Sequence, residues 1–533
     1  MAGDVDDALE QVQHDAASRS RLAGEVAVLL DRPDLLPASA PAATRARAAW
    51  SLGDLSGAVR ILEDAGHEAT PPARRMRNEI ELLTTGRRLS PPSREPLRSV
   101  PEPGDALRAL HFLTNSLPHT QSGYSLRSHN VLTSQLRHGI EPLALTRTGY
   151  PVMIGRPWCA DEDEVDGVLY RRTLPPALGA SPEERLDQEV QEAMRLVREF
   201  RPHVLHATTD YRNALVAQAV STATGIPWIL EVRGLMEQTW IASHRSEATR
   251  EIAAGSEKVR RIVDVEGGIA READAVITLS TTMADVLVAR GVDPERLWIV
   301  PNGVDPGLLE QTLSTDQARE RIDAALAPDH LVVGVVSALV DYEGHDVLLR
   351  AAAVLLADDT VPSDVRRRLR VAVVGDGVSA PALQALAGEL GISDRLIMPG
   401  RVGRDEARTW VQALDVVAVP RKDLEVTRSV TPQKPAEAMA LGRPVVASDL
   451  PALRETLTGP TGEVLGLLVP SDSPEDLSRA LARLLVDTAE RERLARAGRE
   501  AAVSRTWPAL MEVYELAYRA SVTNSSERCR DGE

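Results

Sequence analysis

The sequence predicts an α/β protein with two doubly wound parallel sheets, preceded by a small all-α region. Two observations support this class. Short, continuous apolar runs alternate with helical stretches between residues 105 and 506, which is the pattern of a parallel sheet covered on both faces. Residues 1 to about 104 instead show helical patterns with polar breaks, at 22–30, 45–50 and 55–64. The length of 533 residues, at a guide of ~150 residues per domain, allows three or four units.

The region 1–104 is predicted to be a helical module that ends in a proline-rich linker. A turn at Gly53-Asp54 separates two of its helices, and the linker at 89–104 holds five prolines. The turn has a faint likeness to a tetratricopeptide repeat, and a plain helical bundle is the alternative. Because this module lies outside the sheet pattern, we expect it to offer a surface for a protein partner.

Two sheet domains follow the linker. The first, 105–306, has expected strands at 109–114, 203–206, 228–232 and 275–279. The second, 307–506, has expected strands at 331–336, 371–374, 396–398, 416–419 and 445–447. A last helix is expected at 507–520, and the polar segment 521–533 is expected to be disordered.

Composition limits the function. The net charge of −17 argues against nonspecific binding of nucleic acids, and it gives no overall attraction to anionic membranes, although a local patch could still bind one. The two cysteines, Cys159 and Cys529, make neither a metal site nor a disulfide framework, which favours a cytoplasmic location. The acidic N-terminus is not expected to be a signal peptide, and no run of ~18 apolar residues predicts a membrane span. No His/Cys/Asp cluster has metal-ligand spacing, so we expect no metal, and we expect no cofactor.

The segment from Thr431 to Gly442 carries the strongest local signal. Thr431 is a suitable N-cap, Pro432 suits the first helical position, and Gly442 suits the left-handed stop. Lys434 then falls in the first turn, where the helix dipole disfavours a positive charge. A bound anion such as a phosphate would resolve this conflict, because backbone N–H groups and the ammonium would converge on it. The alternative is an ion pair between Lys434 and Glu437.

Four segments together resemble retaining glycosyltransferases of the GT-B fold, family 4. They are Thr431-Pro432-Gln433-Lys434-Pro435-Ala436-Glu437-Ala438-Met439-Ala440-Leu441-Gly442, Leu297-Trp298-Ile299-Val300-Pro301-Asn302-Gly303-Val304-Asp305, Val371-Ala372-Val373-Val374-Gly375-Asp376-Gly377 and Gly466-Leu467-Leu468-Val469-Pro470. Tyr342-Glu343-Gly344 and the Thr-Pro-x-Lys-Pro motif further resemble a branch associated with exopolysaccharide-type gene products.

This resemblance implies two Rossmann-like domains, of which the second binds a nucleoside-diphosphate sugar. Glu437 would be the second glutamate of the family's Glu-x7-Glu motif and would contact the donor. The loop after the third strand would hold the nucleotide base through backbone atoms of Arg401 and Val402. The remaining donor-side residues implied by the motifs are Asn302, Gly375, Gly377 and Thr431.

Three positions depart from the family's commonest pattern. Ala338 stands where the family has an arginine, Glu343 where it has a lysine, and Ser429 where it has the first glutamate. A leaving diphosphate still needs cationic stabilisation, because its charge develops in the transition state. We expect Arg421, which ends a strand, and Lys434 to supply this stabilisation.

The first domain should supply the acceptor side, because ligands of doubly wound sheets bind at the carboxyl ends of strands. Gly123 permits close backbone approach at a helix N-terminus. His206 ends one expected strand, and Glu231 and Arg233 end another. These four residues are predicted to bind substrate.

The expected reaction moves a sugar from the donor to a glycan, lipid-linked or small-molecule acceptor, with a role in polysaccharide biosynthesis. The resemblance implies retention by front-face attack, and contact with a membrane periphery stays open. Two alternatives remain. The chain could be a catalytically silent GT-B scaffold that acts through its N-terminal helices, or a sugar-nucleotide epimerase of the same fold.

Overall fold

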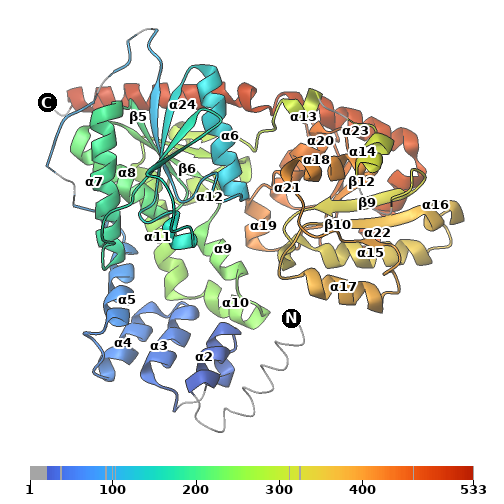
Figure 1. The fold of residues 1–533 in the computed structure, drawn as a ribbon, viewed down its shortest axis with the longest axis horizontal. Helices are drawn as coiled ribbons and strands as arrows, with labels where there is room; N and C mark the ends of the chain where they lie inside the picture. Colours follow the sequence, from blue (N-terminus) through green and yellow to red (C-terminus); the bar gives the residue numbers. More distant parts are fainter. Residues whose placement is uncertain are drawn as a thin grey trace. The chain divides into compact units, whose positions relative to one another are not determined.

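The computed structural model describes residues 21–36, 39–90, 93–98, 100–102, 104–310, 313–322, 326–459 and 461–531. Two compact units divide these residues (Figure 1). Unit 1 combines the chain up to Thr278 with Met283–Val300 and the segment from Met511 onward. Unit 2 comprises Leu279–Thr282 and Pro301–Leu510. The predicted break after residue 306 therefore falls slightly too late.

Unit 1 contains an eight-stranded sheet in the order β3-β4-β2-β1-β5-β6-β7-β8. All neighbours are parallel except β3, which runs antiparallel to β4. The strands are β1 (Arg108–Leu113), β2 (Glu141–Thr146), β3 (Glu162–Val165), β4 (Val168–Arg172), β5 (Val204–Thr208), β6 (Trp228–Val232), β7 (Ala275–Thr278) and β8 (Leu297–Ile299). The main helices are α6 (Gly123–His138), α7 (Pro182–Phe200), α8 (Tyr211–Thr224), α9 (Met236–Ala242), α10 (Glu247–Ala254), α11 (Glu257–Glu272) and α12 (Thr281–Ala289).

Unit 2 contains a six-stranded sheet in the order β11-β10-β9-β12-β13-β14, with all pairs parallel. The strands are β9 (Leu331–Val336), β10 (Leu369–Val374), β11 (Leu396–Ile397), β12 (Val416–Val419), β13 (Val445–Ser448) and β14 (Leu467–Val469). The helices are α13 (Gly307–Glu310), α14 (Thr315–Arg321), α15 (His345–Ala357), α16 (Ser363–Arg368), α17 (Ala380–Glu389), α18 (Arg404–Ala413), α19 (Glu425–Ser429), α20 (Lys434–Ala440), α21 (Pro451–Leu457), α22 (Pro474–Val486) and α23 (Thr488–Val503).

The apolar runs become the central strands of both sheets. Their β-branched and aliphatic side chains are buried on both faces, as parallel strands require. In unit 2 one core cluster packs α15 and α22 against the sheet, and a second packs α18 and α20 against it. The predicted fold class of two doubly wound sheets is confirmed.

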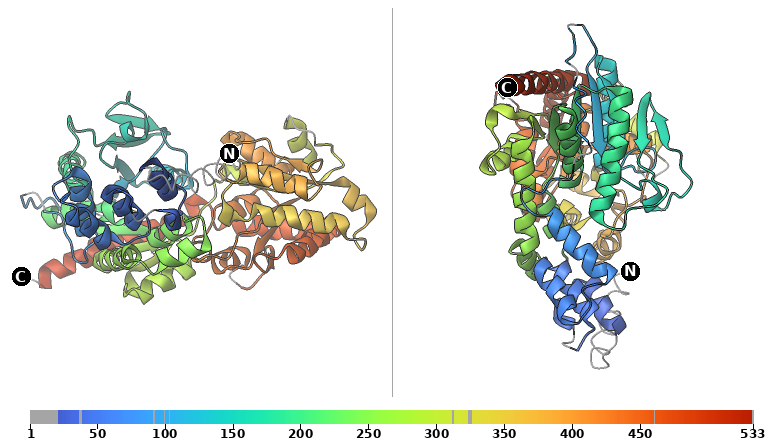
Figure 2. Two further views of the ribbon diagram at one scale, coloured as in Figure 1. Left: turned by 90° about the horizontal axis from the view of Figure 1, so that it is seen from below. Right: turned by 90° about the vertical axis from the view of Figure 1, so that its left-hand side faces the viewer.

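The helices α2 (Arg21–Leu29), α3 (Ala42–Ser51), α4 (Leu55–Asp64) and α5 (Pro71–Leu82) form the N-terminal helical region; residues 1–20 lie outside the described residues. These helices belong to unit 1 and lie beside α9–α11 (Figure 2). Ser56 donates two hydrogen bonds to Glu257, and Asp31 accepts from Thr249. The region is thus docked on the first sheet domain.

The last helix, α24 (Trp507–Asp531), corrects the prediction of a helix at 507–520 followed by a disordered tail. The helix continues because neither glycine nor proline occurs between Pro508, its second residue, and Gly532. Ser521 and Val522 are buried, and the carbonyl of Val522 accepts a hydrogen bond from Arg98. The polar composition of 521–531 had suggested disorder, but polar residues also suit a helix that packs through one face.

Candidate functional site

The loops of unit 2 that follow β9, β10, β11 and β12 meet at one edge, because all these strands are parallel. Glycines allow the loops to approach closely. A Cβ added to Gly375 would lie 1.8 Å from the Ser337 carbonyl, and one at Gly377 would lie 2.3 Å from the Leu339 carbonyl. Both glycines therefore serve backbone packing in this structure.

The start of α20 differs from the prediction. The helix begins at Lys434 with Gln433 as its N-cap, so Thr431 does not cap it. Pro435 explains the shift: with Thr431 as N-cap, its carbonyl would need the N–H of residue 435, and proline has none. The Thr431 carbonyl instead accepts a hydrogen bond of 2.7 Å from the Asn302 amide. Asn302 is buried, so its observed role is to hold this segment.

Lys434 forms an ion pair with Glu343. From the sequence, Glu343 was noted only as the position where the family has a lysine. The Lys434 ammonium donates to Glu343 Oε2 at 2.8 Å, and Arg421 Nη2 donates to Glu343 Oε1 at 3.0 Å. These two cations hold the pKa of Glu343 at about 2 against the effect of burial. Within the described chain no ion pair joins Lys434 to Glu437. The alternative of a local Lys434–Glu437 pair is therefore wrong.

Arg421 is more enclosed than Lys434. It also donates to the Val430 carbonyl at 2.9 Å, its guanidinium lies 5.9 Å from the Tyr342 ring centroid, and its Nε is buried without a partner. Next to Glu343, burial and Lys434 lower the pKa of His345 to about 4, so its imidazole is neutral at pH 7. Lys434 remains partly exposed and can reach a ligand.

Glu437 and Arg401 face solvent at the same edge of unit 2. Among the described residues, neither side chain makes a hydrogen bond or an ion pair. Glu437 is exposed on α20, one turn after Lys434. Arg401 and Val402 follow Gly400, whose carbonyl accepts from Gly375 N at 2.9 Å and joins two of the loops. These side chains can therefore receive a ligand.

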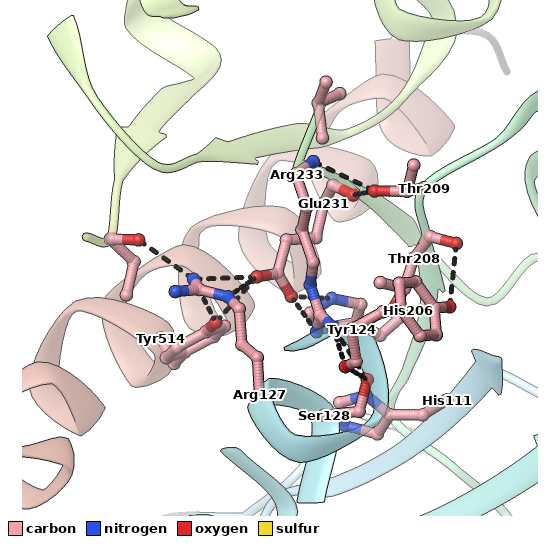
Figure 3. A network of polar contacts seen from close by, with 12 residues as sticks. His111, Tyr124, Arg127, Ser128, His206, Thr208, Thr209, Glu231, Arg233 and Tyr514 are labelled. Carbon is pink, nitrogen blue, oxygen red and sulfur yellow. Dashed lines mark hydrogen bonds and ion pairs between the residues drawn. The ribbon is translucent and has the colours of Figure 1, made fainter. Parts of the chain in front are cut away.

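Unit 1 holds a buried polar network centred on Glu231, the last residue but one of β6 (Figure 3). Its Oε1 accepts from Arg127 Nη2 at 2.9 Å and from the Tyr514 hydroxyl at 3.0 Å. Its Oε2 accepts from Arg233 Nη2 at 3.0 Å and lies 3.1 Å from His206 Nε2. The two guanidinium groups hold the pKa of Glu231 well below its usual range despite full burial.

His206 and Glu231 had been predicted to bind substrate directly, and the structure encloses both side chains completely. His206 Nδ1 lies 2.7 Å from the Tyr518 hydroxyl, and its ring stacks on His111 at 4.5 Å. Burial lowers the pKa of His206, which keeps the ring neutral. Because these partners occupy both ring nitrogens, His206 and Glu231 act as supports in this structure.

Arg233 and Gly123 stand at the carboxyl edge of the first sheet. Arg233 Nη1 donates to Ser128 Oγ at 2.7 Å, and its guanidinium lies 5.2 Å from the Tyr124 ring centroid. Its Nε is buried without a partner. Gly123 opens α6 and is exposed, and a Cβ there would meet nothing within 4 Å. Of the four residues predicted on the acceptor side, Gly123 is exposed, whereas the Arg233 guanidinium is buried and held by Ser128 and Glu231.

A small cavity of about 20 Å³ lies near the same edge of unit 1, between the ends of β5 and β6. Asp210, Glu266 and Arg290 line it together with apolar side chains. Burial and neighbouring acids raise the pKa of Glu266 to about 8. The volume suits one water molecule.

Sequence reasoning missed Arg127, Tyr514 and Tyr518, which complete the Glu231 network. Tyr514 and Tyr518 are spaced i,i+4, so they lie on one face of the predicted last helix. This spacing could have identified the two tyrosines from the sequence as neighbours on one helix face. Arg127 offered none, because its partner Glu231 lies far away in the sequence. No cluster that could hold a metal ion, and no helix long and apolar enough to cross a membrane, occurs in the part of the chain that the structure describes.

Comparison with known proteins gives family matches on both sheets. Residues 122–303 match the family described as glycosyl transferase 4-like domain, and residues 330–487 match glycosyl transferases group 1. A D-inositol 3-phosphate glycosyltransferase of Stackebrandtia nassauensis is 34% identical over 258 residues, which cover 47% of this chain and 55% of that protein. One of Saccharomonospora viridis is 34% identical over 271 residues, covering 49% and 59%. The chain thus spans little more than half the length of these curated relatives.

Solved structures of low sequence identity share the fold. Sucrose-phosphate synthase from Thermosynechococcus elongatus has a TM-score of 0.60 at 19% identity, over 77% of this chain and 98% of that one. HepE of Anabaena, solved in complex with UDP and glucose, has a TM-score of 0.56 at 18% identity, over 76% and 97%. With the two family matches in this order on two Rossmann-like sheets, the chain belongs to the group 1 glycosyltransferases of the GT-B fold.

Proposed function

We propose that this protein is a retaining glycosyltransferase that moves a sugar from a nucleoside-diphosphate sugar to a hydroxyl acceptor. The observation that carries this proposal is the pair of ligand-accessible charges on α20. Lys434 is a partly exposed cation at the carboxyl edge of the second sheet, and Glu437 is an exposed carboxylate with no hydrogen bond or ion pair among the described residues. A diphosphate and a sugar or ribose hydroxyl are the groups that such a pair binds.

The residues at this edge take different roles. Lys434 stabilises the charge that develops on the leaving diphosphate. Glu437 accepts a hydrogen bond from a donor hydroxyl, and the backbone of Arg401 and Val402 holds the base. Arg421, enclosed by Val430 and Glu343, acts by positioning the charges around Lys434. Thr431, whose Oγ1 is buried without a hydrogen-bond partner among the described residues, would support the segment before α20 through its bond from Asn302.

We infer retention, because no accessible acceptor base is evident among the described residues that were predicted to bind the acceptor. Inversion needs a base on the far face of the sugar, and the buried His206 and Glu231 are not accessible for that role. Front-face attack needs only a well-bound leaving diphosphate that can take the acceptor proton. An α-linked donor would then yield an α-linked product.

Donor and acceptor classes are proposed from the relatives and from unit 1. HepE was solved with UDP and glucose, which makes a UDP-sugar the first donor to test. The curated relatives are named for D-inositol 3-phosphate, which makes a polyol phosphate a further acceptor to test. The other acceptors to test are the glycan and lipid-linked classes expected from the sequence. Gly123 would face the acceptor, and the buried Arg233 would support this edge through Ser128 and Glu231. The low cysteine content supports a cytoplasmic location, and the proposal includes a protein partner at the N-terminal helices and peripheral contact with a membrane.

The test is acceptor-dependent release of nucleoside diphosphate from a panel of sugar nucleotides, followed by proton NMR of the product. We expect diphosphate release only when an acceptor is present, and an α anomeric coupling in the product. Absence of turnover with any donor, although the nucleotide binds, would favour the silent scaffold. Conversion of the donor without an acceptor would favour the epimerase. A β coupling would contradict the mechanism.

A further inference from the structure

Six charged side chains gather at the carboxyl edge of the second sheet, on the segments after β9 and β12 and at the start of α20. Three are cations and three are carboxylates, and each cation is paired. The pairs are Arg421 with Glu343 at 3.0 Å, Lys434 with Glu343 at 2.8 Å, Lys422 with Asp341 at 2.7 Å, and Lys422 with Asp346 at 3.3 Å. Since His345 is neutral, this charge cluster has no net charge.

The carboxylates of the charge cluster differ in their environment. The Glu343 side chain is only 9% exposed and bridges two cations, whereas the Asp341 side chain is 68% exposed and meets one. Solvent screens an exposed charge far more strongly than an enclosed one. Glu343 therefore dominates the electrostatic environment of Lys434, although both carboxylates lie in the same short turn, η5 (Asp341–Glu343).

Glu343 also cannot be neutralised under ordinary conditions. Because its pKa is held at about 2, it stays ionised throughout the working range of pH. The Lys434 ammonium has three N–H groups, and the one bond to Glu343 leaves donors for a ligand. A phosphate can therefore join Glu343 at Lys434, but it meets a cation whose charge is already partly compensated.

We propose that Glu343 is an affinity-setting residue that acts as a resident counter-ion in the donor site and keeps the binding of nucleoside diphosphates weak. This inference rests on the proposed function, because it takes Lys434 as the diphosphate ligand. The consequence for the reaction is rapid release of the nucleoside diphosphate product. A site with the family's lysine at this position would carry two additional positive charges and would hold the product more tightly.

The decisive variant is Glu343→Gln, which keeps the side-chain shape and removes the charge. Calorimetric titration with UDP, GDP and ADP is expected to show affinity raised by about tenfold or more, as a unit charge near a diphosphate implies. The affinity of the variant should also fall more steeply with added salt than that of the wild type. Asp341→Asn is the matched control, because it removes the same charge from the same turn at an exposed position. It should change affinity by less than threefold.

A thermal melt of Glu343→Gln beside the wild type guards against misfolding, because a variant that keeps the cooperative transition is folded and its affinity can be compared. We expect the variant to keep that transition. A diphosphate affinity in Glu343→Gln that is unchanged or weaker, or equal gains in Glu343→Gln and Asp341→Asn, would overturn the inference while leaving the proposed function intact. Failure of the wild-type protein to bind any of the three nucleoside diphosphates would instead remove the proposed function on which the inference rests.

Discussion

At the scale of the residue, buried carboxyl groups of this protein differ in charge state according to their partners. Cations hold the pKa of Glu343 at about 2 and that of Glu231 far below its usual value. Among the described residues, the Glu189 side chain accepts a hydrogen bond only from the Thr148 N–H, at 3.2 Å, and burial raises its pKa to about 7. Partner geometry, and not burial alone, therefore sets the charge of each group.

Glu189 should make the stability of the protein depend on pH. Its folded pKa of about 7 exceeds the ordinary value of 4.5, so the folded state binds the proton more tightly. This stabilisation is complete below about pH 4.5 and is lost as the pH rises through 7. Glu189→Gln keeps the acceptor for Thr148 without the titration. Thermal melts between pH 5.5 and 8 should show a smaller decline for the variant than for the wild type, and parallel declines would show that Glu189 is ionised in the fold.

Glu437 should affect turnover and not stability. Its side chain is exposed and makes no hydrogen bond or ion pair among the described residues, so Glu437→Gln removes no internal contact. Turnover should fall by about tenfold or more, as expected for a charged hydrogen bond to the substrate, while the melting temperature stays within about 1 °C. A large loss of stability with normal residual turnover would identify Glu437 as a structural residue instead.

At the scale of the element, the loops at the edge of the second sheet depend on close backbone contact. Gly344, in the left-handed region at φ +72°, has no room for a side chain: an added Cβ would lie 1.8 Å from the Pro420 carbonyl. Gly391 has a similar φ of +69° but open space around it. A comparison of alanine at the two positions therefore distinguishes the cost of a steric clash from the cost of backbone strain.

Alanine at these two glycines should have unequal effects. Gly391→Ala should cost about 1 kcal/mol, the price of the left-handed conformation alone. Gly344→Ala adds a clash with Pro420, so it should cost at least ~3 kcal/mol and weaken nucleotide binding, because the segments carrying Glu343 and Arg421 must move apart. Urea titration and calorimetry measure both effects. Equal losses of stability in Gly344→Ala and Gly391→Ala would show that the segments carrying Gly344 and Pro420 do not pack as described.

Most elements were predictable because apolar runs determine central strands. The exceptions have physical reasons. Strand β2 begins Glu141-Pro142 and has only a short apolar run, and β3 is acidic, so neither gives a clear strand signal. At the start of α20, Thr431 has the sequence features of an N-cap and Pro432 those of a first helical residue. Pro435 has no N–H for the Thr431 carbonyl, and the helix starts at Lys434 instead. The Asn302 side chain then bonds the Thr431 carbonyl, a longer-range contact that local rules do not predict.

At the scale of the whole molecule, the two sheets follow from sequence pattern, whereas the partners of the site residues do not. Lys434 was identified from its place in a helix, but its partner Glu343 lies on another strand-end loop that only the folded sheet brings near. The same holds for Glu231, Arg127 and Tyr514. The sequence therefore predicts that ligands bind at the carboxyl edges of the two sheets. The folded structure is needed to show which charged side chains at these edges are paired with one another.

The docking of the N-terminal helices predicts the effect of their removal. A chain that starts at residue 104 loses the bonds from Ser56 and Asp31 and uncovers α9–α11. Its melting temperature should fall by several degrees, because a loss of ~2 kcal/mol already has that effect. Nucleotide binding should persist, since the Lys434 site lies within unit 2. An unchanged melting temperature would indicate an independent module.

Titration of UDP, GDP and ADP into the wild type and into Lys434→Met tests the central claim most directly. We expect at least one of these ligands to bind the wild type, and its affinity to fall by about tenfold to a hundredfold in Lys434→Met, because one charged hydrogen bond is lost. Lys422→Met, whose ammonium faces the more exposed carboxylates of Asp341 and Asp346, should lose less. Equal affinities of the wild type and Lys434→Met would contradict the assignment of Lys434 as the diphosphate ligand.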